Sequence, residues 1–392
     1  MTAVKRCYGD DGLCLELLDA AGAPVAIVSC FLRQLAARGC SPNTIVAYAH
    51  DLQHLWRFLT GHGLEWDKLR PSDTLGLLEH LRASPCRRRR MHRLGPALVA
   101  GTAVVATRLS PATINRVLAA VSSFYEWAIL AQHFDRQNPI EKRVDPALMR
   151  VSDRHRPFLE GTGRQQPIRR TVRVRTVQRL PRPLGSEQVA ALILALRCKR
   201  DHALVRLMLD GGLRPGEVLG LHLADVAYGR RRIVIRARQD HPKGARSKGR
   251  TERVVDLHEP ATLEAVSLYV MAERPTDATT PFVFLVGGGG ARRCEPLGYA
   301  ALAKLFARAC ERAGIREPWV TPHVLRHTHA TRMWEGGMRE LALQKRLGHA
   351  SPESTRVYTR VSDPAVVTEY RRALGIEEKA DEPTAAARDP AP

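Results

Sequence analysis

The sequence lacks several patterns that define whole classes of protein. Its eight cysteines are scattered from Cys7 to Cys310 without a Cys-x-x-Cys pair, which argues against a disulfide framework and against a thiolate zinc site. The longest apolar run, from Pro96 to Ala106, contains Gly and Thr and is too short to span a bilayer. No basic-then-apolar signal peptide opens the chain. We therefore expect a cytoplasmic protein whose cysteines are mostly reduced packing residues.

Acidic residues are few relative to basic ones. Asp and Glu total 40 against 61 Lys and Arg, which gives a formal net charge of +21. A soluble chain with this excess is expected to bind a polyanion, with nucleic acid as the first candidate and an acidic membrane surface as the second. The length of 392 residues and the apolar content of 44% suit two folded domains of ordinary size.

Two stretches in the first half of the chain begin with the same helix-start signal. Ser41 and Ser110 are suited to cap a helix, and the prolines that follow each of them suit the first helical position. Apolar residues then recur at spacings of three or four, which predicts two amphipathic helices. We assign these helices to an N-terminal helical domain over residues 25–145, while the residues before it carry no strong periodicity.

Two basic segments interrupt the helical pattern. The run CRRRRMHR, from Cys86 to Arg93, is either a solvated loop or a contact to a DNA backbone. Residues 146–183 are rich in Arg, Pro and Gly and have little apolar patterning, so we predict a basic linker between domains. The candidate DNA-contacting residues in these segments are Arg87, Arg88, Arg89, Arg90, Arg169, Arg170 and Arg173.

The second half of the chain predicts a mainly helical domain over residues 184–376. Within it, residues 233–237 and 253–257 are β-branched and read as two strands joined by a long polar loop. The remaining residues, 377–392, have the acidic, Ala- and Pro-rich composition of a disordered tail.

The sequence HVLRHTHAT follows another helix-start signal. His323 and Arg326 are three residues apart, so both lie on one face at the start of a helix, where the helix dipole favours an anion. A zinc site formed by His323, His327 and His329 is an alternative, but the spacing is not HExxH and no fourth ligand is evident. A purely structural role in capping and packing the helix is a further alternative.

The sequence DGGLRPGEV predicts a second anion site. Gly211 and Gly212 end one helix and Pro215 begins the next, which leaves Arg214 at a helix N-terminus with Glu217 one turn further on. The planar guanidinium can bond two phosphate oxygens at once. The alternative is a surface arginine paired with Glu217.

The polar loop between the strands carries Lys243 and Lys248. A lysine on such a loop is either solvated or able to donate a proton to a departing alkoxide. Further on, Gly348 ends a helix, His349 follows in the turn, and Tyr358 lies on the next short helix. A tyrosine with a pKa near 10 acts as a nucleophile only where other groups assist it.

Together these segments supply two arginines, a lysine acid, two histidines and a tyrosine, the parts that a metal-free phosphoryl transfer needs. Their order and spacing resemble the tyrosine recombinase (phage integrase) family. GGLRPGE resembles its first-arginine motif, KGRTERVVDL its lysine motif, HVLRHTHAT its HxxR motif, and LGHAS with Tyr358, nine residues after His349, its terminal motif. The capped helices look like the family's N-terminal core-binding (SAM-like) domain.

The resemblance implies a reaction and a role for each residue. Tyr358 would attack a scissile DNA phosphate to form a 3′-phosphotyrosine bond and free a 5′-hydroxyl. Arg214 and Arg326 would hold the non-bridging oxygens while charge builds on them. A partner strand would then reseal the DNA without ATP, metal or other cofactor.

The remaining roles concern proton transfer and support. Lys248 would protonate the leaving 5′-oxygen. Counting back from the Glu-Arg pair at the second strand favours Lys248 over Lys243, although the loop is longer than is common in the family. His323 and His349 would hydrogen-bond the phosphate and assist proton transfer at the tyrosine, and Glu217 would support the site from behind.

The resemblance also implies the partners. It predicts binding to double-stranded DNA recombination sites, assembly of four protomers on DNA, and no membrane partner; accessory proteins are an open addition. A helix starting at Asp363 and Pro364 would dock on a neighbouring protomer. The alternatives are a type IB topoisomerase, which swivels and reseals one duplex, and a DNA-binding regulator that keeps the fold without the chemistry.

Overall fold

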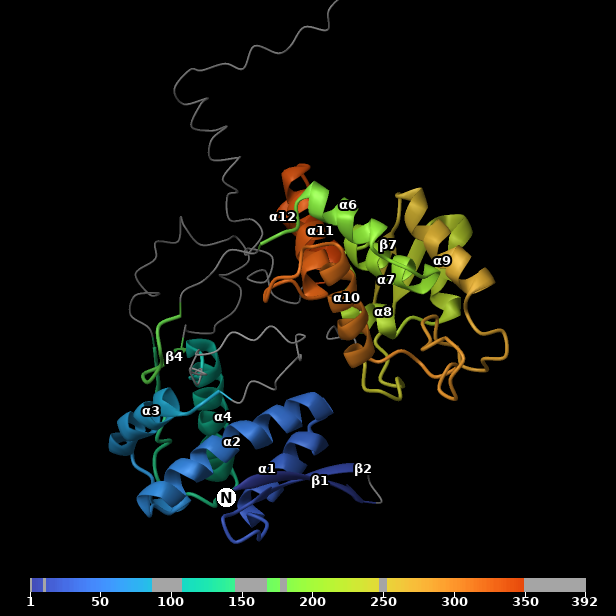
Figure 1. Ribbon diagram of the computed structural model, residues 1–392. Coiled ribbons are helices and arrows are strands. Elements are labelled where there is room, and N and C mark those ends of the chain that lie inside the picture. The colour runs from blue at the N-terminus through green and yellow to red at the C-terminus, as the bar shows by residue number, and fades with distance from the viewer. Residues whose placement is uncertain are drawn as a thin grey trace, which may run out of the picture. The chain divides into compact units, whose positions relative to one another are not determined.

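The computed structural model describes residues 2–9, 12–86, 108–144, 168–176, 182–246 and 252–348. The chain divides into two compact units, Met1–Gln178 and Arg179–Pro392 (Figure 1). Several predicted features lie outside the described residues, namely Lys248, His349, Tyr358, the run Arg87–Arg90, the helix after Asp363 and the tail 377–392.

The N-terminal unit is a helical domain preceded by a hairpin. Its helices are α1 (Ala26–Ala37), α2 (Pro42–His62), α3 (Thr74–Ala83) and α4 (Pro111–Leu130), with short 3₁₀ turns η1 (Trp66–Lys68) and η2 (Pro71–Asp73). The predicted helix starts are confirmed, because the Ser41 and Ser110 hydroxyls accept hydrogen bonds from the amides of Thr44 and Thr113, each at 3.2 Å.

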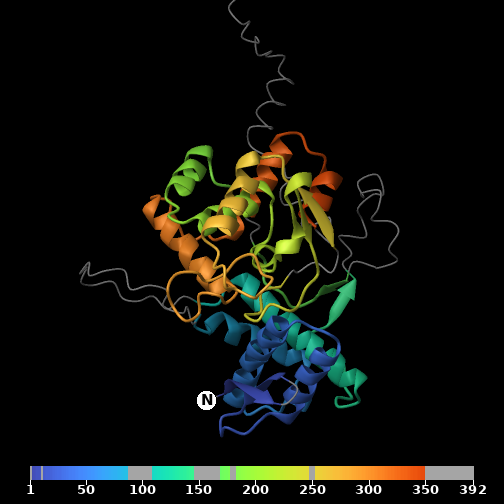
Figure 2. The same cartoon turned by 90° about the vertical axis from the view of Figure 1, so that its right-hand side faces the viewer.

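The core of this unit lies where α1, α2 and α4 meet. Phe31, Trp56 and Phe124 come from these three helices and are buried, and Phe124 packs edge-on against both of the others. Figure 2 shows the three helices, coloured blue to teal, gathered in one bundle. Aromatic side chains therefore supply much of the apolar area that holds the helices together.

Two small sheets in this unit were not predicted. Strands β1 (Ala3–Gly9) and β2 (Gly12–Leu18) form an antiparallel hairpin, and Leu15 and Leu17 are buried against the helices. The leucines of β2 recur at every second residue, which is the spacing of a strand. This alternation is too short to predict a strand from the sequence.

The second unpredicted sheet joins two segments that are far apart in the sequence. Strand β4 (Ile168–Arg170) pairs with β3 (Lys142–Val144), although β4 falls inside the expected linker 146–183. Val174 lies just beyond β4. The Asn115 side chain, from α4, donates to the Val174 carbonyl and accepts from the Val174 amide, each at 2.8 Å. The two bonds satisfy both backbone polar groups of Val174, and residues 168–176 fall within the compact unit Met1–Gln178.

The C-terminal unit is mainly helical and carries one small sheet. Its helices are α6 (Ser186–Leu194), α7 (Lys199–Asp210), α8 (Pro215–Leu219), α9 (Pro260–Ala272), α10 (Tyr299–Arg312), α11 (His323–Glu335) and α12 (Glu340–Leu347). Short 3₁₀ turns η5 (Leu223–Asp225) and η6 (Tyr228–Arg230) flank β5. Helix α7 packs against both α9 and α11, so it forms the centre of this unit.

The sheet of the C-terminal unit is antiparallel with the order β5-β6-β7. Its strands are β5 (Val226–Ala227), β6 (Arg232–Ile235) and β7 (Arg253–Asp256). The two predicted strands correspond to β6 and β7 and pair in the register Ile233 opposite Val255, both of which are buried. Within the described ranges, none of the helices combines the length and apolar composition that crossing a bilayer requires.

Candidate active site

The turn between α7 and α8 places an arginine and a glutamate side by side. Helix α7 ends at Asp210, and Gly212 turns the chain with a positive φ of 64°, which glycine adopts at little cost. Pro215 begins α8, so Arg214 is its N-cap residue. Glu217 Oε2 accepts from the Arg214 amide and Oε1 accepts from Arg214 Nη1, each at 2.8 Å. The expected pairing of these two residues is present, but the pair is largely buried rather than on the surface.

Glu217 is a buried anion with more than one cationic partner. Arg253, the first residue of β7, donates from Nη1 to Oε1 at 2.9 Å and from Nη2 to Oε2 at 2.7 Å, a two-point pairing that is stronger than a single bond. Burial by itself raises the pKa of Glu217, but the bonds and charges of Arg253 and Arg214 outweigh it and lower the pKa to about 2. The carboxylate is therefore ionised at neutral pH and holds both arginines in place.

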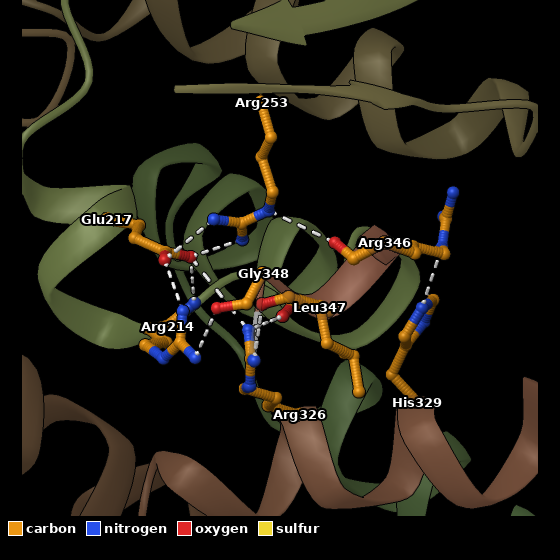
Figure 3. Close-up of polar contacts among 9 residues, drawn as sticks. Arg214, Glu217, Arg253, Arg326, His329, Arg346, Leu347 and Gly348 are labelled. Carbon is orange, nitrogen blue, oxygen red and sulfur yellow. Dashed lines mark hydrogen bonds and ion pairs between the residues drawn. The ribbon is translucent and has the colours of Figure 1, made fainter. Parts of the chain in front are cut away.

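Arg326 reaches the same place from α11. It is buried, donates from Nη1 to the Gly212 carbonyl at 2.7 Å, and lies 3.9 Å from Glu217 Oε2. The structure thus brings Arg326 to Arg214 and Glu217, which lie more than a hundred residues earlier in the chain. Figure 3 shows Arg214 and Arg326 next to each other, below the Glu217 carboxylate and beside the carbonyls of Leu347 and Gly348.

The C-terminal end of α12 is bound by three arginines, Arg214, Arg253 and Arg326. The carbonyls of Arg346, Leu347 and Gly348 accept in turn from Arg253 Nε at 3.1 Å, Arg326 Nη2 at 2.6 Å and Arg214 Nη2 at 3.0 Å (Figure 3). These carbonyls have no partner inside the helix, and the negative end of the helix dipole favours cations. As predicted, Gly348 ends the helix, with a φ of 63°, so residue 349 follows directly from a backbone that the arginines hold.

The three histidines of α11 have different surroundings. His323 begins the helix and is exposed, and His327 is half-buried, with its pKa lowered first by burial and then by His323 and Arg326. His329 is buried, with Nδ1 bonded to the Leu209 carbonyl at 2.8 Å and Nε2 accepting from Arg346 Nε at 3.0 Å. Both nitrogens of His329 are engaged in hydrogen bonds, which argues against the zinc alternative. Among the residues that the structure describes, no three His, Cys, Asp or Glu side chains gather as metal ligands would.

Lys243 is held by an acidic partner. Its Nζ lies 2.8 Å from Glu295 Oε2, and its backbone amide donates to Nδ1 of His241 at 3.1 Å. Lys243 is thus anchored on the described side of the loop between β6 and β7. The loop continues into residues 247–251, which lie outside the described residues.

The candidate DNA-contacting arginines are placed only in part. Arg169 and Arg170 lie in β4, opposite Arg143 and Lys142 of β3, and Arg173 is exposed just beyond the strand. Within β3, Lys142 is paired with Glu126, and Arg143 with Glu141 at 2.8 Å.

Sequence reasoning missed Arg253 and Arg346. A signal for Arg253 existed: it lies two residues before Val255, so both side chains point to the same face of β7, and that face is buried. An arginine on the buried face of a strand requires a partner. Arg346 gave no comparable signal, because its acceptors are a histidine and two backbone carbonyls.

A helical N-terminal domain followed by a domain in which two arginines meet at a buried acid is the arrangement of an integrase-type DNA strand transferase. The description "Phage integrase, N-terminal SAM-like domain" matches residues 28–132, and "Phage integrase family" matches residues 183–364. The chain belongs to the phage integrase family and is a tyrosine recombinase.

Two relatives agree with this assignment. The chain is 29% identical to transposase A from transposon Tn554 of Staphylococcus aureus, with 91% of this chain and 93% of that protein covered. It is 26% identical to tyrosine recombinase XerD of Rhizobium meliloti, covering 86% of this chain and 91% of that protein.

Among solved structures, the chain shares its fold with the Tn1549 transposon integrase in complex with transposon right end DNA. The TM-score is 0.58 and the identity 18%, over 89% of this chain and 99% of that one. A second similar structure is the XerH site-specific recombinase bound to a palindromic difH substrate, with a TM-score of 0.57 and 18% identity over 87% of this chain and 81% of that one.

Proposed function

We propose that this tyrosine recombinase cuts and rejoins specific DNA sites through a 3′-phosphotyrosine bond to Tyr358. The observation that carries the proposal is the meeting of Arg214 and Arg326 at Glu217, beside the helix end that leads to His349. Two cations from different helices at one buried acid are suited to bind the two non-bridging oxygens of a phosphate.

The electrostatic arrangement supports a role in the transition state. As the tyrosine oxygen attacks, negative charge increases on the phosphoryl oxygens, and donors that are already oriented need no reorganisation. Glu217 orients Arg214 through two hydrogen bonds. His323 and His349 assist at the phosphate and at the tyrosine, and Lys248 protonates the leaving 5′-oxygen. Because the phosphodiester energy stays in the protein–DNA bond, resealing needs neither ATP nor metal.

The proposed partner is double-stranded DNA, bound by a tetramer with two duplexes. The net charge of +21 and the basic pairing of β3 with β4 support contact with phosphates, which provide affinity without choosing a sequence. The similar XerH and Tn1549 structures contain DNA substrates of those proteins. We place the reaction in the cytoplasm, where DNA and reduced cysteines occur together, and accessory proteins are an optional part of the assembly.

Tyr358→Phe tests the nucleophile. On a nicked target duplex, the wild-type chain should form a covalent protein–DNA adduct that survives denaturation, and the variant should form none while binding DNA as before. An adduct in the variant would require another nucleophile. A two-site plasmid assay separates the alternatives: relaxation without exchange of flanking DNA indicates a topoisomerase, and binding without any adduct indicates a regulator.

Replacement of the two lysines tests the acid. Lys248→Ala should slow cleavage far more than Lys243→Ala, because Lys243 is paired with Glu295. A 5′-phosphorothiolate leaving group needs no proton and should restore the rate of Lys248→Ala. Equal defects in the two variants, or no restoration, would contradict the assignment.

A further inference from the structure

Arg346 has no role in the reaction as proposed above, yet its guanidinium connects three elements to α12. Nε donates to Nε2 of His329 at 3.0 Å, Nη1 to the Asp256 carbonyl at 3.2 Å, and Nη2 to the Asp210 carbonyl at 3.2 Å. His329 lies in α11, Asp256 ends β7 and Asp210 ends α7. One side chain therefore ties the last turn of α12 to the elements that surround the candidate active site.

His329 is suited to be the fixed acceptor for this guanidinium. Its Nδ1 bonds to the Leu209 carbonyl, which can only accept, so Nδ1 carries the proton and Nε2 is left to accept from Arg346. Burial, followed by the charge of Arg346, lowers the pKa of His329 to about 4, so the ring is neutral at neutral pH. A side chain at Gly212 would come within 2.5 Å of the ring, which shows how closely the ring is confined.

The main chain of Arg346 is held as well. Its carbonyl accepts from Arg253 Nε at 3.1 Å, and the next two carbonyls accept from Arg326 and Arg214 (Figure 3). The side chain of Arg346 and the backbone of residues 346–348 are thus bound from opposite directions. These bonds hold the end of α12, up to Gly348, in place.

We propose that Arg346 is a positioning residue for DNA cleavage: it fixes the end of α12 from which the chain continues to His349 and Tyr358. This inference rests on the proposed function. The guanidinium of Arg346 donates to His329, Asp256 and Asp210 and to neither Arg214 nor Glu217, so the pairing of Arg214 with Glu217 does not depend on it directly. Loss of the guanidinium should therefore disturb the approach of the nucleophile and leave binding of the phosphate in place.

The expected effect is on rate rather than on affinity. A displacement of about 1 Å at a reacting group can cost about 100-fold in rate. Arg346→Met keeps the length of the side chain and removes all three hydrogen bonds. The rate constant for adduct formation at saturating DNA should fall by about 100-fold, with the dissociation constant for DNA unchanged.

Arg274→Met is the matched control. Arg274 is also half-buried in the C-terminal unit and also donates to backbone carbonyls, those of Thr280 at 2.7 Å and Phe282 at 3.1 Å. Its loss should lower the melting temperature as Arg346→Met does. It should leave the rate constant for adduct formation unchanged.

The experiment measures single-turnover adduct formation by full-length wild type, Arg346→Met, Arg346→Lys and Arg274→Met on the same nicked duplex. Loss of positioning lowers the rate constant at full final yield, whereas simple destabilisation lowers the yield at an unchanged rate constant. Arg346→Lys retains the charge and one donor, so its rate constant should lie between those of wild type and Arg346→Met. If the methionine variant does not fold, the lysine variant alone tests the positioning role.

Three outcomes would overturn the inference: an unchanged rate constant in both Arg346 variants, a loss of yield alone, or equal slowing in Arg274→Met. Failure of the proposed function looks different, because the wild-type chain itself would then form no adduct, or Tyr358→Phe would still form one.

Discussion

Two buried carboxylates, one in each unit, have pKa values that are shifted in opposite directions. Asp51 of α2 is paired with Arg116 of α4 at 3.0 Å, and the arginine is 53% exposed. Burial raises the pKa of Asp51 to about 6, and the charge of Arg116 lowers it only in part. Glu217 is equally buried, yet Arg253 and Arg214 bring its pKa to about 2.

The difference between the two pKa values follows from the hydrogen-bond partners of the two carboxylates. Burial opposes the charge of both carboxylates. Asp51 has one solvated partner, whereas Glu217 receives paired hydrogen bonds from Arg253 and a backbone and side-chain bond from Arg214. The number and geometry of the donors, rather than the depth of burial, decide whether the pKa of a buried acid rises or falls.

The largest expected effect follows from Glu217→Gln. Removing one charge from a buried cluster leaves cations without compensation and typically costs about 3–5 kcal/mol. We expect the free energy of unfolding to fall by that amount and the rate of adduct formation to fall by about 100-fold, because Arg214 loses its orientation. Urea denaturation and single-turnover cleavage check the two effects, and a variant as stable as wild type would contradict the comparison.

The corresponding replacement of Asp51 by its amide should increase the free energy of unfolding instead of reducing it. Because the folded-state pKa is about 6, above that of a free Asp near 3.9, ionisation of Asp51 reduces stability as pH rises through this interval. Asp51→Asn should therefore raise the free energy of unfolding at pH 7.5 by about 1–3 kcal/mol and have no effect at pH 4. Cleavage activity should be unchanged. Destabilisation at pH 7.5 would show that Arg116 compensates the charge.

Lowering the pH should affect the contribution of Glu217 to stability and that of Asp51 differently. Glu217 has a folded-state pKa of about 2, below its unfolded value near 4.3, so its stabilising charge is fully present above that value and is lost as pH falls toward 2. The stability difference between wild type and Glu217→Gln should therefore shrink between pH 4.3 and 2. Denaturation curves for both proteins across this range measure it, and a constant difference would refute the role of the charge.

The smallest effect is expected for Arg116→Met. A half-exposed cation is screened by water, so its pairing with Asp51 should contribute about 1 kcal/mol or less at pH 7.5. At pH 4 the effect should vanish because Asp51 is protonated. The pKa of Asp51 should rise further, which an NMR titration of its carboxyl carbon would detect; a fall would mean that Arg116 is not the partner.

The sequence predicted those parts of the site that depend on local spacing. Arg214 and Glu217 are three residues apart across a helix start, so their pairing follows from helical geometry. That Arg326 meets them could be expected only from the family resemblance, since its bonds go to the Gly212 and Leu347 carbonyls. Backbone carbonyls are the same in every residue, so acceptors of this kind leave no signal in a sequence.

The fold, like the site, was predictable where it depends on local spacing and not where it depends on distant contacts. Capped amphipathic helices such as α2 and α4 were predictable from Ser-Pro starts and regular apolar spacing. The pairing of β3 with β4 and the bond between Asn115 and Val174, 59 residues apart, depend on tertiary contacts. A short basic segment with isolated valines has too little pattern to identify its partner in advance.

The bonds at the end of α12 also imply an order in which the site is completed. Arg214, Arg253 and Arg326 all precede their acceptor carbonyls in the chain, and a protein is synthesised from its N-terminus. Each donor therefore leaves the ribosome before the carbonyl that it binds, and both leave before residue 358. The groups that we propose to bind the phosphate are therefore synthesised before Tyr358, the proposed nucleophile.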